Sequence, residues 1–314
     1  MEAEADLIAY LPEELRGPDT AIAKIAAGLS GAGVYRVMTA GRAFLLKVAR
    51  GDEPLDAWQR RVHVQREAGA AGVAPQVVHA DEAHRAVVSE MIADRSFIAY
   101  YMNPATRPAA IAELGATLRR VHELALPPGG ESREPRQFLA DMWSTFASFA
   151  VPAFVAEAVR DMLAVTPPPA DRPLALCHND VNPSNLAYDG ARVLLLDWDT
   201  AGANDPLYDL AAAALFLRMD EPTCRALLAA HDGAPVAALP LRFGYLRRLV
   251  GVLCGVIFLH LARTGGHAGD ASAAATPLAE LYQQMRTGSL NVASAGGQFR
   301  FGLALVDAAT APVP

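Results

Sequence analysis

The chain has 314 residues and a net charge of −7, and 52% of its residues are hydrophobic. This composition predicts a globular protein of one large or two modest domains with an ample core, and it argues against extensive disorder. The acidic balance argues against nucleic acid as a main partner, because no basic surface is available to replace the counterions of a phosphate backbone.

The first residues combine a short helical pattern with an acidic composition. Residues 6–16 predict a helix, with Asp6 as a possible cap and Pro12 as a break or second start. The basic segment and apolar run of a secretory signal are missing. The three cysteines lie far apart without metal-ligand spacing (Cys177, Cys224 and Cys254). We therefore expect a cytoplasmic protein with reduced thiols, without a disulfide framework or a zinc site.

Residues 21–48 have strand patterns separated by glycine-containing turns. The alternation over residues 34–39 and the turn at Gly41 predict antiparallel hairpins. Between the first two strands lie Gly28, Ser30, Gly31 and Gly33. Backbone amides there could approach triphosphate oxygens without interference from a Cβ atom. A hairpin turn that uses glycine merely for its positive φ is the alternative.

Lys47 lies inside the apolar strand FLLKVAR, where an unpaired charge is costly. In kinases, a strand lysine of this kind contacts the α- and β-phosphates and pairs with a helix glutamate. The next segment has a modest apolar stripe at helical spacing, formed by Trp58, Val62 and Ala70. Glu67 on this segment is the candidate partner of Lys47. A surface pair of Glu67 with Arg60 or Arg66 is the alternative.

The remaining sheet and the helices follow in order. Residues 76–80 and 86–91 predict the last two strands of a five-stranded sheet. Helices are predicted over residues 111–124, 138–149, 208–217, 221–230, 242–263 and 276–287, and residues 308–314 are expected to fray. His122 is expected to be a satisfied core histidine. The apolar segment 249–259 is shorter than the about 20 residues that span a bilayer, so no membrane span is expected.

Two short apolar strands, residues 175–177 and 193–196, flank a polar segment with the residues of a phosphoryl-transfer centre. Such a centre needs a carboxylate for the attacking hydroxyl and oxygen ligands for Mg²⁺. The order His178-x-Asp180-x4-Asn185, followed by Asp197, predicts Asp180 as the base and Asn185 and Asp197 as the metal ligands. A lone loop Asp is usually a turn or cap residue. The spacing and the second Asp favour the catalytic interpretation.

The motifs HNDVNPSN, LLLDWD and AGANDPLYDLA resemble those of the aminoglycoside phosphotransferase and choline kinase superfamily, and its choline/ethanolamine kinase branch most of all. The resemblance extends over about residues 21–265. Two positions depart from the branch's usual DWEYAG wording. Asp199 stands in place of Glu and shortens a carboxylate beside the metal site. Thr200 stands in place of Tyr and removes an aromatic ring near the acceptor pocket.

The resemblance implies an α+β, protein-kinase-like fold in two lobes. Residues 1–92 would form the small antiparallel sheet lobe that binds ATP, and residues 93–314 the helical lobe with the catalytic and acceptor sites. ATP would contact Ser30, Gly31, Gly33 and Lys47. The backbone of the hinge residues Glu90, Met91 and Ile92 would face adenine.

The resemblance also implies roles for three further residues. The order of strand lysine and helix glutamate in the superfamily favours the pairing of Lys47 with Glu67. His178 is expected to orient the catalytic loop, which extends from His178 to Asn185. Asp209 begins a helix after a proline, so it is expected either to cap that helix or, as the superfamily implies, to brace the catalytic loop.

The implied activity is that of a small-molecule kinase that uses ATP and Mg²⁺. Choline or ethanolamine is the first acceptor, and a thiamine kinase or an aminoglycoside-type phosphotransferase is the alternative. A nucleotide-binding pseudokinase is disfavoured because the base, the metal ligands and the strand lysine are all present.

The sequence further predicts an amine-bearing acceptor that is recognised by carboxylates more than by aromatic rings. Thr200 removes one ring of a possible cage for a quaternary ammonium. Asp199, Asp205 and Asp209 are expected near the acceptor, where they could accept charge-assisted hydrogen bonds from an amine.

Overall fold

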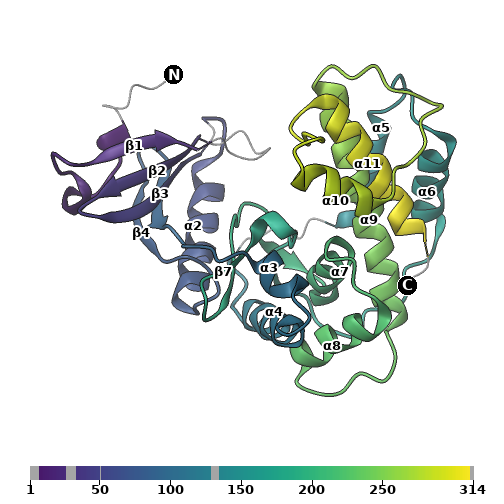
Figure 1. The fold of residues 1–314 in the computed structure, drawn as a ribbon, viewed down its shortest axis with the longest axis horizontal. Coiled ribbons are helices and arrows are strands. Elements are labelled where there is room, and N and C mark those ends of the chain that lie inside the picture. The colour runs from purple at the N-terminus through teal and green to yellow at the C-terminus, as the bar shows by residue number, and fades with distance from the viewer. Residues whose placement is uncertain (1–6, 26–32, 50, 129–133, 312–314) are drawn as a thin grey trace.

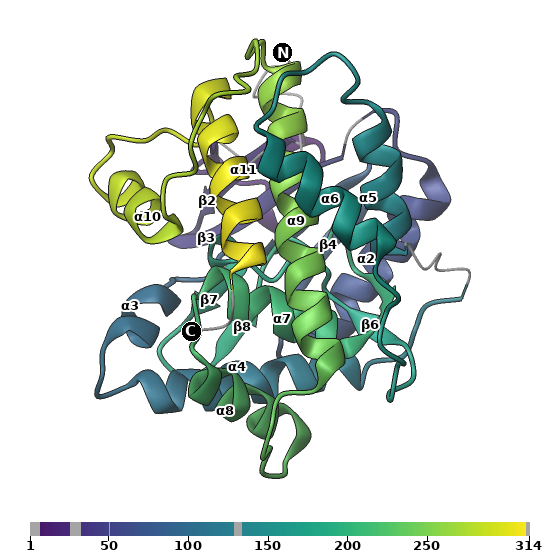
Figure 2. The same ribbon diagram turned by 90° about the vertical axis from the view of Figure 1, so that its right-hand side faces the viewer.

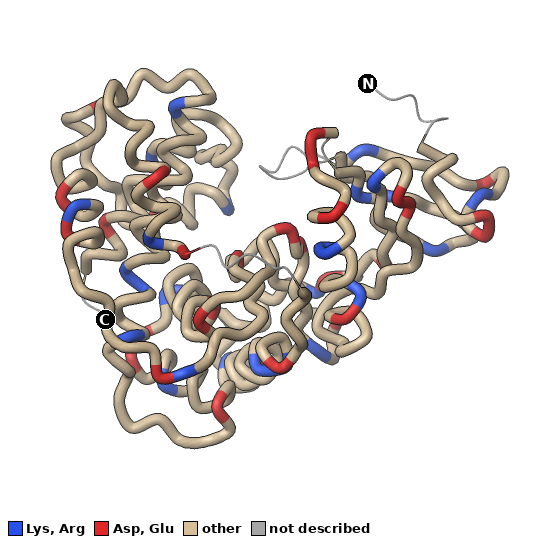
Figure 3. The backbone as a smooth tube through the Cα atoms, turned by 180° about the vertical axis from the view of Figure 1, so that it is seen from behind, with Lys and Arg blue, Asp and Glu red and all other residues tan. Residues whose placement is uncertain are grey.

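The computed structural model describes residues 7–25, 33–49, 51–128 and 134–311. A five-stranded antiparallel sheet is followed by a mostly helical region (Figure 1), which confirms the expected α+β kinase-like fold. Lys and Arg positions are interspersed with Asp and Glu positions over both regions (Figure 3). The net negative charge is therefore not confined to one of them.

The sheet has the order β1-β2-β3-β5-β4. Its strands are β1 (Ala21–Lys24), β2 (Gly33–Thr39), β3 (Arg42–Val48), β4 (Val77–Asp81) and β5 (Ala86–Glu90). Every neighbouring pair is antiparallel. Alternation places the apolar side chains of Val37, Phe44, Leu46 and Val88 in one buried cluster on the sheet. The strands predicted from the period-two pattern are confirmed.

The described part of the predicted N-terminal helix is largely not helical. Leu7 and Ile8 are helical, the possible cap Asp6 lies outside the described residues, and the 3-10 helix η1 (Glu13–Leu15) follows Pro12. Pro12 provides the break that the sequence suggests, because it has no N–H for a continuing helix. Leu7, Leu11 and Leu15 are buried against the sheet, so this segment closes the small core.

Helix α2 (Leu55–Ala70) lies between the sheet and the helical region and packs against both (Figure 1). Trp58 and Val62 pack against the sheet residue Val87, whereas Val64 and Ala68 belong to the large helical core. Ala70 is exposed, so its place in the predicted apolar stripe is wrong. The stripe turns towards the helical core in the second half of the helix.

The helical region is built around a long central helix (Figure 2). Its helices are α3 (Phe97–Met102), α4 (Arg107–His122), α5 (Pro135–Ser144), α6 (Ala153–Ala164), α7 (Pro206–Phe216), α8 (Glu221–Asp232), α9 (Leu241–Thr264), α10 (Leu278–Arg286) and α11 (Ala295–Thr310). The sequence pattern did not predict α3, α6 and α11. Residues 308–310, which were expected to fray, belong to α11.

Helix α9 alone, among the described helices, has the length and composition of a membrane span, yet most of it is buried inside the molecule. It packs closely on α11 because glycines face the contact. A Cβ atom on Gly255 would lie 2.8 Å from the carbonyl oxygen of Gly302. The expectation of a buried core helix is therefore confirmed.

Four three-residue strands frame the polar segment. Strand β6 (Ala175–Cys177) pairs with β9 (Gly202–Asn204), and β7 (Leu186–Tyr188) pairs with β8 (Val193–Leu195). The two predicted strands are confirmed, but each has a partner that the sequence did not reveal. These ladders bring the segments after β6 and β8 together.

Candidate active site

The carboxylate of Asp180 is held by two amide groups. Asn182 Nδ2 donates to its Oδ1 over 2.9 Å, and Asn185 Nδ2 donates to its Oδ2 over 2.7 Å. Burial raises the pKa of Asp180 above its ordinary value, and the negative charge of Asp197 acts in the same direction against these hydrogen bonds. Asn182 was not predicted, although its position at the N-cap of η2 (Pro183–Asn185) is a recognisable local signal.

Asp197 follows β8 and faces the strand lysine. Lys47 Nζ lies 2.7 Å from Asp197 Oδ1. Burial alone would raise the pKa of Asp197, but the charge and hydrogen bond of Lys47 hold it below its ordinary value. Asp197 has a φ of 59°, a left-handed conformation that is uncommon outside glycine and is often found at functional sites.

Asn185 and Asp197 fit a hard cation. Asn185 directs its amide nitrogen to Asp180, and its Oδ1 accepts no hydrogen bond from a described residue. The side chain of Asp197 is 41% exposed. Neutral and anionic oxygens of this kind, which leave room for water and phosphate, are typical ligands of Mg²⁺.

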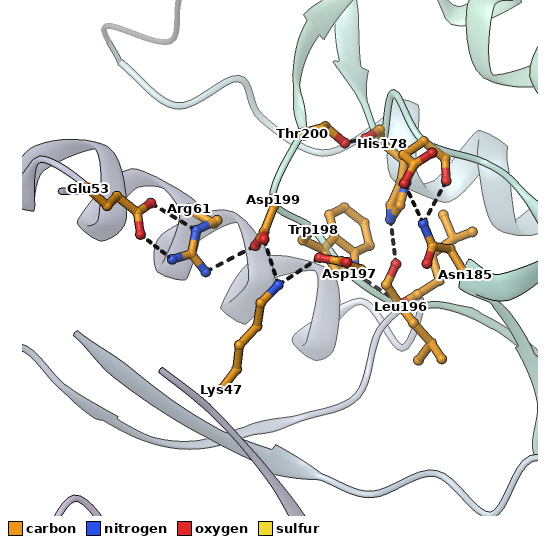
Figure 4. Close-up of polar contacts among 12 residues, drawn as sticks. Lys47, Glu53, Arg61, His178, Asn185, Leu196, Asp197, Trp198, Asp199 and Thr200 are labelled. Atoms are coloured by element: carbon orange, nitrogen blue, oxygen red, sulfur yellow. Dashed lines mark hydrogen bonds and ion pairs between the residues drawn. The ribbon is translucent and has the colours of Figure 1, made fainter. Parts of the chain in front are cut away.

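The predicted pair of Lys47 with Glu67 is wrong. Glu67 is exposed on α2, whereas Lys47 Nζ lies 2.7 Å from Asp199 Oδ2 in addition to its contact with Asp197. Arg61 of α2 approaches the same Asp199 on its other side (Figure 4). The acids beside Lys47 thus come from the segment that follows β8, and α2 contributes a cation.

Asp209 braces the catalytic loop, as the resemblance implies, and it does not cap α7. Its Oδ2 accepts the backbone N–H of His178 over 2.7 Å, and its Oδ1 accepts that of Asn179 over 2.8 Å. The His178 ring contacts the Leu196 carbonyl oxygen through Nε2 at 2.9 Å. Thr200 Oγ1 donates to the carbonyl oxygen of His178 over 3.0 Å. The loop is therefore tied to both neighbouring segments.

Two histidines extend this network. His122 Nε2 lies 3.1 Å from Asp209 Oδ2, and its Nδ1 lies 2.8 Å from His231 Nε2. His122 is thus a satisfied core histidine, as expected. The thiol of Cys177 lies within 4.8 Å of ligand atoms of His122 and Asp209, but Asp209 and His122 already satisfy each other, so this group needs no metal. His231 was missed because α4 and α8 are far apart in sequence.

Asp205 is not available to an acceptor, and its predicted substrate role is contradicted. It is buried, and its Oδ1 caps α7 by accepting the N–H of Leu207 over 2.9 Å. Its Oδ2 forms an ion pair with Arg242. Asp209 is also fully buried. The proposed recognition of the acceptor by these two carboxylates is therefore wrong, because protein donors already occupy both.

The nucleotide-binding residues are only partly described. Gly28, Ser30 and Gly31 lie outside the described residues, and Gly33 begins β2. Glu90 ends β5 and donates its N–H to Gln76, and the carbonyl oxygen of Ile92 accepts the N–H of Asp94 over 3.0 Å. The contact of Glu90 and Ile92 with adenine stays a prediction.

Comparison with known proteins supports the superfamily resemblance. Residues 21–245 match the family model APH, described as the phosphotransferase enzyme family. Two curated proteins called LicA, both from Haemophilus influenzae, are 46% identical over 35 residues. These two matches cover only 13% and 10% of the curated proteins.

Solved structures have the same fold at low sequence identity. A choline/ethanolamine kinase family protein from Mesorhizobium loti aligns over 96% of this chain and 98% of its own, with 22% identity and a TM-score of 0.65. LicA in complex with AMP aligns over 94% and 95%, with 17% identity and a TM-score of 0.60. A spectinomycin phosphotransferase in complex with ADP and spectinomycin aligns over 92% of each chain, with 13% identity and a TM-score of 0.57.

Proposed function

The chain belongs to the phosphotransferase enzyme family, and from that premise we propose that it transfers the γ-phosphoryl group of ATP to the hydroxyl of a small amine-bearing alcohol. Choline or ethanolamine is the first candidate. The observation that supports this proposal best is the convergence of Asp180, Asn185, Asp197 and Lys47 on one site. Similar proteins that bind AMP or ADP support the choice of nucleotide. A cytoplasmic location remains part of the proposal.

Asp180 orients the acceptor and takes its proton. The acceptor oxygen forms a bond to the γ-phosphorus, the bond from that phosphorus to the β–γ bridging oxygen breaks, and ADP leaves with that electron pair. The hydroxyl proton moves to Oδ1 or Oδ2 of Asp180. The amides of Asn182 and Asn185 hold this carboxylate in place. The raised pKa of Asp180 makes it a better proton acceptor than an ordinary exposed carboxylate.

Lys47 provides positive charge for the phosphates. It reaches the site from β3 and already lies between two carboxylates. Asn185 and Asp197 would hold Mg²⁺, which supplies positive charge to the phosphate oxygens during transfer. Asp209 and His178 hold the loop of Asp180 in place beside the segment that precedes Asp197.

The choice of choline or ethanolamine rests on sequence motifs and on similarity to kinases of that branch. Aminoglycoside-type phosphotransferases have comparable folds, and a fold alone does not determine the acceptor. The acceptor screen must therefore include both classes.

The test is release of ADP by purified protein with Mg·ATP and one of four acceptor types: choline, ethanolamine, thiamine and aminoglycosides. Acceptor-dependent ADP release with choline or ethanolamine supports the proposal. Release only with an aminoglycoside or with thiamine would replace the proposed acceptor. Nucleotide binding without turnover on any acceptor would favour the pseudokinase interpretation.

A further inference from the structure

Asp199 lies between two cations that come from different elements (Figure 4). Its Oδ2 is 2.7 Å from Lys47 Nζ of β3, and its Oδ1 is 3.3 Å from Arg61 Nη1 of α2. The side chain of Arg61 is only 11% exposed. A charge so far removed from water needs opposite charges around it. Arg61 is therefore a built-in part of the site and not a surface residue that happens to lie nearby.

Glu53 fixes the other side of the same guanidinium. Arg61 Nε donates to Glu53 Oε1 over 3.2 Å, and Nη2 donates to Oε2 over 2.8 Å. Such a two-pronged contact sets the plane of the guanidinium as well as its position. The remaining Nη1 is then directed at Asp199. The planar guanidinium of an arginine presents separate nitrogen atoms to Glu53 and to Asp199. A lysine has one ammonium nitrogen and would make only part of these contacts.

The five side chains form a line of alternating charge: Glu53, Arg61, Asp199, Lys47 and Asp197. Lys47 is shared by the last two carboxylates. If nucleotide phosphates share the ammonium of Lys47 with the two carboxylates, Asp199 receives less of its positive charge and needs a second positive neighbour. Arg61 is that neighbour, and it can hold one oxygen of Asp199 while the other orients Lys47.

We propose that Asp199 and Arg61 are positioning residues for nucleotide binding: Asp199 orients the ammonium of Lys47, and Arg61 fixes Asp199. This inference rests on the proposed function, because it takes Lys47 to be the phosphate-binding group. Asp199 is then the acidic partner of Lys47, the role that was predicted for Glu67 from the sequence. Its shorter side chain, compared with the Glu usual in the branch, suits this role because Lys47 and Arg61 both reach it.

The test is calorimetric titration of the full chain with Mg·ADP. We compare Arg61→Gln and Asp199→Asn with Arg60→Gln as the matched control. Arg60 is the adjacent arginine of α2, its side chain is 37% exposed, and among the described residues it pairs with Asp56 at 2.7 Å. Arg61→Gln and Asp199→Asn are each expected to raise the Kd for Mg·ADP by about 10-fold, the scale of one charge-assisted hydrogen bond. Arg60→Gln should change it by less than about 2-fold, the scale of an exposed helix pair.

A second pair of variants separates orientation from charge. Glu53→Gln keeps Arg61 but removes the charge of one of its two acidic partners. The increase in Kd for Mg·ADP is therefore expected to be smaller than for Arg61→Gln. Arg61→Lys keeps the charge without the fork and should fall between wild type and Arg61→Gln. Steady-state kinetics should show a raised KM for ATP and an unchanged KM for the acceptor. Thermal unfolding identifies a variant that fails to fold, in which case the remaining variants decide.

Equal nucleotide affinities for Arg61→Gln and Arg60→Gln, or a rise in the acceptor KM with the nucleotide Kd unchanged, would overturn the inference. Failure of the proposed function looks different. In that case the wild-type protein itself neither binds Mg·ADP nor releases ADP with any acceptor.

Discussion

Asn185 donates its amide hydrogen to Asp180 over 2.7 Å, so the residue assigned to the metal also fixes the residue assigned to the proton. The same amide group contacts the backbone carbonyl oxygen of Asp180 at 3.0 Å. The catalytic loop therefore couples its two functions through one side chain. Substitutions of Asp180 and of Asn185 should therefore have different effects, because only Asn185 is also assigned to the metal.

Replacement of the base should abolish turnover and spare nucleotide binding. Asp180→Asn is expected to lower kcat by about 10²- to 10⁴-fold, the usual contribution of general-base catalysis. The Kd for Mg·ATP should change by less than about 2-fold, because the proposed partner of Asp180 is the acceptor hydroxyl. Asp161→Asn, at an exposed position of α6, serves as the control. Turnover near the wild-type rate in Asp180→Asn would exclude it as the base.

Loss of a metal ligand should be visible in the Mg²⁺ titration. Asp197→Ala and Asn185→Ala are each expected to raise the Mg²⁺ concentration that gives half-maximal activity and to lower kcat. Asn185→Ala should show an additional loss of kcat that remains at saturating Mg²⁺, because it also removes the hydrogen bond to Asp180 Oδ2. Wild-type Mg²⁺ curves for both variants would contradict the metal assignment.

Asn182 allows the positioning effect to be measured without a metal ligand. Its Nδ2 holds Asp180 Oδ1 over 2.9 Å. Asn182→Ala is expected to lower kcat by about 10-fold, the scale of one hydrogen bond to a charged group, with an unchanged Mg²⁺ requirement. A shift of the Mg²⁺ curve as large as that of Asn185→Ala would show that Asn182 also serves the metal.

Local patterns predicted the sheet and most helices because burial on one face repeats at a fixed period. The four short strands around the site were harder. Strand β9 (Gly202–Asn204) has no apolar run, and its pairing with β6 depends on residues far away in the chain. Helix α11 begins with Ala295, Gly296 and Gly297, which weakens its helical pattern. Tertiary packing against α9 overrides that weakness.

The candidate site was predicted where the chemistry is local and missed where it is not. Asp180, Asn185 and Asp197 follow from spacing along one segment. The partner of Lys47 does not, because Lys47 and Asp197 are 150 residues apart. The sequence pattern favoured a helix glutamate, Glu67, whereas the carboxylates beside Lys47 are those of Asp197 and Asp199. Only the folded chain distinguishes these candidates.

Asp209 should contribute stability that depends on pH. Burial alone would raise its pKa, but the hydrogen bond and charge of His122, together with His178, hold the pKa below the ordinary value of 3.8. A group with a lowered folded pKa stabilises the fold above its ordinary pKa and loses that effect as the pH falls through the folded pKa. Asp209→Asn should lower the free energy of unfolding at pH 7 by about 3 kcal/mol.

The difference between Asp209→Asn and wild type should shrink when the pH is lowered below 3.8. Urea unfolding at a series of pH values measures it. Glu123→Gln, an exposed pair with Arg119 at 2.8 Å, is the control, and its effect should stay within about 0.5 kcal/mol. A constant deficit of Asp209→Asn down to the lowest pH would mean that the charge of Asp209 is not the stabilising feature.

Asp205 should affect stability and not acceptor recognition, contrary to the interpretation of its sequence position. Its carboxylate caps α7 and pairs with Arg242, so no part of it is left for an amine. Asp205→Asn retains a cap acceptor but loses the ion pair, and it is expected to lower the free energy of unfolding by about 3 kcal/mol. Asp205→Ala also loses the cap, which adds about 1 kcal/mol.

The KM for ethanolamine should stay within about 2-fold of wild type in every Asp205 variant that folds, because the site itself is not touched. Urea unfolding and steady-state kinetics on the same preparations separate the two roles. A large rise in the KM for ethanolamine with unchanged stability would restore Asp205 as an acceptor-binding residue.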